Sequence, residues 1–137
     1  MTDLSGVLPH RPPMLLLDAV VDVHPGRGLT GVLAVPPGGG EVPPYLLLES
    51  WLQAAAVLLG LDGAGAGRLP LVGAVRDVRF GRAALPGETV AHRVELVRAV
   101  HATAICTGSS AVGGQPVLRV GQATLVAQEH PPAAGHG

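Results

Sequence analysis

One acidic side chain stands alone in the most apolar stretch of the chain. The stretch 43–60 carries a single charge, on Glu49, and Gln53 follows four residues later. On a helix, residues four apart share a face. A lone carboxylate in apolar surroundings is costly to bury, and such groups concentrate at functional sites. We therefore take Glu49 as the first catalytic candidate, able to donate or accept a proton. Gln53 either supports that chemistry at the substrate or simply packs.

The chain offers few other reactive groups. Cys106 lies in a predicted strand and is interpreted as a small core residue, with a nucleophilic thiol as the alternative. Five histidines beside turns, strand ends or the tail are predicted to be surface residues, and their spacing suits no metal site. These are His24, His92, His101, His130 and His136. We expect no metal and no cofactor.

The element that must position Glu49 is a helix over residues 43–60. Pro43 and Pro44 can open a helix, and Gly60 can close it. A helix apolar on all sides is expected to be buried on all sides. Because Glu49, Ser50 and Gln53 interrupt the apolar run, we predict a core helix and no membrane span.

Two strands are predicted before this helix and four after it, over 14–23, 29–35, 70–80, 89–100, 103–112 and 116–128. In the strand 89–100, Val90 and Val94 fall on one side and Arg93 on the other. Glycine-rich turns join the first two strands and the last two as hairpins. We predict an α+β domain over 1–128, an antiparallel sheet around one helix, and a disordered tail over 129–137. One helix covers only one face of a sheet, so we expect a dimer.

Composition narrows the function further. The net charge is −1 with no run of like charges, which gives a nucleic-acid partner no electrostatic support. All nine basic residues are arginines, so Schiff-base chemistry and a phosphate-loop lysine are excluded. One cysteine excludes an internal disulfide and favours a reducing compartment. With no export signal visible, we expect a cytoplasmic protein.

Four segments in the same order resemble the β-hydroxyacyl-acyl-carrier-protein dehydratase family of the FabZ/FabA type. They are residues 8–18, 48–55, 78–88 and 113–116. The resemblance implies the hotdog fold, a carrier-protein-bound substrate and removal of water from a 3-hydroxyacyl thioester in fatty acid or polyketide biosynthesis. In that family a histidine removes the α-proton and a carboxylic acid helps the hydroxyl leave. The two come from different subunits of a dimer.

Glu49 matches the family carboxylate, whereas the family's loop histidine has no counterpart. Residues 36–44 form a shorter loop without histidine, and its Gly39 and Gly40 could offer N–H groups to a thioester carbonyl. A closer resemblance is to the short-loop dehydratase-like proteins of aryl polyene and related polyketide pathways. It implies a heterodimer with a second hotdog dehydratase that supplies the histidine. A homodimer using His10 as the base is the alternative, although the family keeps a histidine here in a structural role.

Two other functions remain open at this point. In a hotdog thioesterase a helix carboxylate activates water without a histidine, so Glu49 alone would suffice. A non-catalytic subunit would only shape a partner's tunnel. Such a scaffold has no need of polar Glu49 and Gln53, which favours an enzyme.

Overall fold

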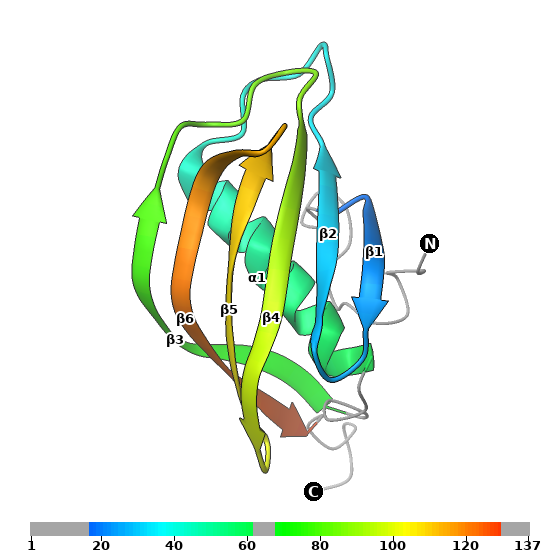
Figure 1. Cartoon of the computed structure of the whole chain (residues 1–137), viewed down its shortest axis with the longest axis vertical. Helices are drawn as coiled ribbons and strands as arrows, with labels where there is room; N and C mark the ends of the chain where they lie inside the picture. The colour runs from blue at the N-terminus through cyan, green and yellow to red at the C-terminus, as the bar shows by residue number, and fades with distance from the viewer. Residues whose placement is uncertain (1–16, 62–67, 130–137) are drawn as a thin grey trace, which may run out of the picture.

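The computed structural model describes residues 17–61 and 68–129. This part of the chain forms one helix and six strands (Figure 1). In chain order they are β1 (Ala19–His24), β2 (Gly28–Ala34), α1 (Pro44–Leu61), β3 (Arg68–Phe80), β4 (Thr89–Val100), β5 (Thr103–Val112) and β6 (Gln115–Glu129). The predicted order of two strands, a helix and four strands is confirmed. β1 begins later than expected, at Ala19, and its predicted residues 14–16 lie outside the described range.

The strands form a single antiparallel sheet in the order β1-β2-β4-β5-β6-β3. Both predicted hairpins are present. The β5–β6 turn needs its glycines, because Gly113 and Gly114 have φ values of 56° and 83°. Two successive positive φ values are typical of the two-residue turn that matches strand twist. β6 runs to Glu129, one residue into the range expected to be tail, and residues 130–137 lie outside the described part.

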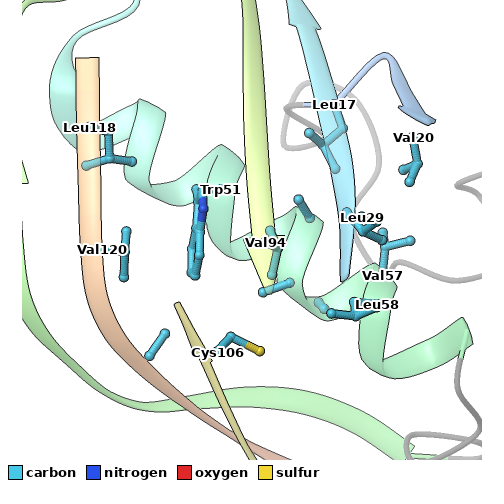
Figure 2. Packing of buried hydrophobic residues seen from close by; sticks show 14 of the residues in the cluster. Leu17, Val20, Leu29, Trp51, Val57, Leu58, Val94, Cys106, Leu118 and Val120 are labelled. Atoms are coloured by element: carbon cyan, nitrogen blue, oxygen red, sulfur yellow. The ribbon is translucent and has the colours of Figure 1, made fainter. Parts of the chain in front are cut away.

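The curved sheet wraps around α1 (Figure 1), and the helix contacts β2 to β6. Two glycines let the helix approach closely. A Cβ at Gly31 would lie 2.9 Å from the Cβ of Ala54, and one at Gly108 would lie 3.0 Å from Cζ2 of Trp51. Figure 2 shows Trp51 reaching from α1 into the core, among Val94 and Val120.

The prediction that α1 is buried on all sides is wrong for the single chain. Trp51 and Val57 are fully buried against the sheet, but Tyr45 is 67% exposed and Glu49 is exposed as well. The reason is geometric, since a sheet that curves round a helix still covers only one side of it. No helix in the described residues is long and apolar enough to cross a bilayer.

Candidate active site

Glu49 lies in the second turn of α1, on the side that the sheet leaves open. The start of this helix is held in place by two loops that pair with each other. Val42 and Ala84 exchange both backbone hydrogen bonds, at 2.7 and 2.9 Å. Val35 N–H also donates to the carbonyl oxygen of Glu88 at 2.9 Å. The segment before the helix is therefore fixed to the β3–β4 connection, and the turn that carries Glu49 begins from a defined point.

The β3–β4 connection is itself braced by an ion pair. Both guanidinium N–H groups of Arg82 donate to the Glu88 carboxylate, at 2.7 and 2.9 Å, and Leu85 N–H donates to the same carboxylate at 2.7 Å. These hydrogen bonds lower the pKa of Glu88 and raise that of Arg82. Glu88 is thus a structural anion. It stabilises the β3–β4 connection, to which the segment before α1 is hydrogen-bonded.

Gln53, four residues after Glu49, is only 2% exposed. The two residues are one helical turn apart, as the spacing predicted, but Gln53 points into the interior while Glu49 faces outward. The Glu49 carboxylate takes part in no hydrogen bond or ion pair within the described residues. The packing interpretation of Gln53 fits this burial, and its role towards substrate stays a prediction.

The loop glycines are placed as expected but are not equivalent. Gly39 and Gly40 are both exposed in the loop before α1. Gly39 N–H donates to the carbonyl oxygen of Pro36 at 3.1 Å, so this donor is already used to form a turn. Gly40 is the remaining candidate of the two for a substrate carbonyl. His10, the other residue assigned to catalysis, lies outside the described residues.

The prediction that His92 is a surface residue is wrong. Its side chain is fully buried, and both ring nitrogens are hydrogen-bonded to serines. Nε2 lies 2.8 Å from the hydroxyl of Ser50 on α1, and Nδ1 lies 2.6 Å from the hydroxyl of Ser110 on β5. Burial lowers the pKa of His92 to about 4, so the imidazole is neutral at physiological pH.

A signal in the sequence could have found this histidine. Strand β4 alternates, and Val90 and Val94 were correctly placed on its inner side. His92 lies midway between them and shares their parity, so the period-two pattern points it inward as well. In this strand the position of the residue determines its burial, and the usual exposure of histidine does not.

Two hollows in the described residues are lined by other parts of the chain, one from β1, β2 and β4 and one from β4, β5 and β6, and Glu49 lines neither of them. No group of three or more histidine, cysteine or acidic side chains in this part of the chain could hold a metal ion. A carboxylate on an open helix face can react with a bound substrate only if something else completes the pocket.

Comparison with known proteins identifies relatives along most of the chain. The 3-hydroxyacyl-[acyl-carrier-protein] dehydratase FabZ of Symbiobacterium thermophilum is 34% identical over 119 residues, covering 80% of this chain and 84% of that protein. FabZ of Clostridium acetobutylicum is 32% identical over 126 residues, covering 84% and 89%. No protein-family model matches the chain.

Solved structures confirm the hotdog fold. A chain of the dehydratase heterocomplex ApeI:P from Xenorhabdus doucetiae superposes with a TM-score of 0.79 at 20% identity, covering 95% of this chain and 93% of that one. A hypothetical thioesterase with coenzyme A from Streptococcus pneumoniae gives a TM-score of 0.65 at 11% identity, covering 82% and 88%. At these identities the superpositions establish the shared architecture only, and the choice between activities depends on the sequence relatives.

Proposed function

The chain belongs to the FabZ family of 3-hydroxyacyl-[acyl-carrier-protein] dehydratases, and from this premise we propose that it removes water from 3-hydroxyacyl thioesters held on an acyl carrier protein. The observation that carries the proposal for this chain is the position of Glu49. It lies near the start of the central helix, within the segment that resembles the family, and its carboxylate is exposed.

The reaction needs a base and an acid on the same substrate. The base removes the proton from the carbon next to the thioester carbonyl, and the electron pair forms the new double bond as the hydroxyl leaves. Glu49, in its protonated form, gives a proton to the departing hydroxyl, so that water and an enoyl thioester are released. In this proposal the N–H of the exposed Gly40 binds the thioester carbonyl, where negative charge develops.

The source of the base is the second part of the proposal. The loop before α1 contains no histidine, and His92 is buried in the core. We propose that a second hotdog dehydratase subunit provides a histidine at Glu49. A homodimer in which His10 is the base is the alternative within the same proposal.

Two open surfaces support a dimer. The outer side of α1 presents Tyr45 and Glu49, and Leu52 on that side is only partly buried. Among the described strands β3 pairs with β6 on one edge, and we propose that its other edge accepts a strand of the partner. A partner seated on the open side of the helix would also enclose the exposed Glu49 carboxylate. We place this assembly, with its carrier-protein substrate, in the cytoplasm.

The test is the intact mass of a 3-hydroxyacyl carrier protein after incubation with this protein. Loss of one water with the protein alone, abolished in Glu49→Gln, would support a self-sufficient homodimer. Loss of water only when a second hotdog dehydratase is added would support the heterodimer. Loss of the whole acyl group would identify a thioesterase, and an unchanged mass in every combination would leave a non-catalytic subunit.

A further inference from the structure

Three fully buried polar side chains form a continuous chain of hydrogen bonds through the core. Ser50 on α1 bonds to Nε2 of His92 on β4, and Nδ1 of His92 bonds to Ser110 on β5. All three residues have 0% exposure. His92 and Ser110 are direct partners in the β4–β5 ladder, so the strand register itself brings the imidazole and the hydroxyl together.

The location of this chain within the core is specific. In the β2–β4 ladder, His92 lies opposite Gly31, the glycine at which α1 approaches the sheet closely. The next residue of the helix makes a parallel contact, because Trp51 Nε1–H donates to the carbonyl oxygen of Arg93 at 2.9 Å. Consecutive helix residues are thus hydrogen-bonded to consecutive residues of β4, within the turn that carries Glu49.

Resting on the proposed function, we propose that His92 is a positioning residue for Glu49, acting through Ser50. Hydrophobic contacts are non-directional, so a helix with a purely apolar inner face could slide or rotate slightly on the sheet. Hydrogen bonds have defined lengths and angles. The Ser50–His92 bond and the Trp51–Arg93 bond together fix the height and the rotation of this turn, and hence the direction in which Glu49 leaves the helix.

The chemistry of the imidazole suits this role. A neutral ring has one N–H donor and one acceptor nitrogen, and each serine hydroxyl can complement either. Both nitrogens are therefore satisfied in either tautomer, without a charge in the core. An aliphatic side chain at this site would avoid the cost of burying polar atoms, but it would give up the hydrogen bond from β4 to the Ser50 hydroxyl.

The sharpest test compares two matched deletions, Ser50→Ala and Ser110→Ala. Each removes one hydroxyl from one nitrogen of the same imidazole, but only Ser50 belongs to the helix. We expect Ser50→Ala to lower kcat about tenfold or more with little change in KM, because small misplacements of a catalytic group are expensive in rate. Ser110→Ala, at a similar loss of Tm, should keep kcat within about threefold. Equal kcat values in the two variants would overturn the proposal.

The variants His92→Leu and His92→Gln test the imidazole itself. Leucine makes neither hydrogen bond, whereas the amide of glutamine can still donate and accept, so His92→Gln should recover part of the kcat that His92→Leu loses. If His92→Leu does not fold, the serine pair decides the question alone. The core variant Leu125→Val, at a buried site on β6, controls for a general loss of stability and should leave kcat unchanged.

A second readout separates this inference from the proposed function. Amide hydrogen exchange in residues 49–53 should be faster in Ser50→Ala than in Ser110→Ala, whether or not the protein is an active dehydratase. An inactive wild type with this exchange pattern would remove the catalytic function but retain the role of His92 in fixing the turn. An active wild type with no difference in exchange or kcat would retain the function and overturn the positioning role.

Discussion

The two sides of α1 differ in how their polar side chains are hydrogen-bonded and exposed. On the inner side three polar side chains have partners within the chain: Ser50 bonds to His92, Trp51 bonds to a backbone carbonyl of β4, and Gln53 is buried with a partner. On the outer side, Tyr45 and Glu49 are exposed. The inner side specifies where the helix lies. The outer side carries the carboxylate that we propose to be catalytic.

This contrast separates the structural role of the inner side of α1 from the proposed catalytic role of its outer side. Buried polar groups without partners destabilise a fold, so those on the inner side must be paired before any other molecule arrives. Glu49 is subject to no such requirement in the single chain, because water can solvate it. Its surroundings can therefore be completed by a second subunit and a substrate, and its reactivity depends on that assembly.

The largest expected effect comes from the outer side. Glu49→Gln keeps the shape of the side chain but removes its acid, and loss of a general acid typically costs about 10²–10⁴ in rate. The free energy of unfolding should change by less than about 0.5 kcal/mol, because the site is exposed. Steady-state kinetics beside urea denaturation checks both values. A large loss of stability with an unchanged kcat would mean that Glu49 has a structural role and not a catalytic one.

The inner side should show the opposite pattern in Trp51→Ala. Removing a fully buried aromatic side chain costs about 3–5 kcal/mol of folding free energy. Trp51→Phe keeps most of the apolar area and loses the bond to the Arg93 carbonyl, so it should cost about 1–2 kcal/mol. Urea unfolding of both variants measures the difference. Equal costs would mean that the hydrogen bond of the N–H group, and not the apolar area of the ring, accounts for the stability.

The sequence predicted the inner side better than the outer one. Prolines and a glycine bounded α1 to within a residue or so, and alternation placed Val90 and Val94 on the inner side of β4. Both signals are local, which is why they can be read without a structure. The exposure of Glu49 could not be predicted in this way, because it depends on what covers the helix in three dimensions.

The hydrogen-bond partners of His92 could not be predicted from the sequence pattern either. Ser50 and His92 are 42 positions apart, and nothing local to either residue indicates the other. The parity of β4 indicates that His92 points into the core, although the surface prediction overlooked it, but parity does not indicate which hydroxyls would contact it. The close approach at Gly31 is similar, since a glycine in a strand indicates a nearby backbone or side chain without identifying it.

The buried histidine predicts a pH-dependent stability. The pKa of His92 is about 4 when folded and near 6.5 when unfolded, so the unfolded chain binds the extra proton between these values. Stability is therefore fully present above about pH 6.5 and is lost as the pH falls towards 4, by roughly 3 kcal/mol at most. His92→Gln should remove this part of the slope. The difference in unfolding free energy between wild type and variant, measured from pH 7 to 4, isolates it from the carboxylates.

The smallest expected effect concerns how closely the inner side fits the sheet. In Gly31→Ala the new Cβ would lie 2.9 Å from Ala54 Cβ and 3.1 Å from Leu17 Cδ2, so helix and sheet must move apart. Overpacking of this kind costs about 1–3 kcal/mol. Gly38→Ala, in the loop before α1, meets nothing within 4 Å and should stay within about 0.5 kcal/mol of wild type. Thermal or urea unfolding ranks the pair. Because Gly31→Ala displaces α1 at Ala54, in the turn that follows Glu49, kcat should fall with stability in that variant, while Gly38→Ala changes neither. Lost stability with unchanged kcat would show that the outer side tolerates movement of the inner one.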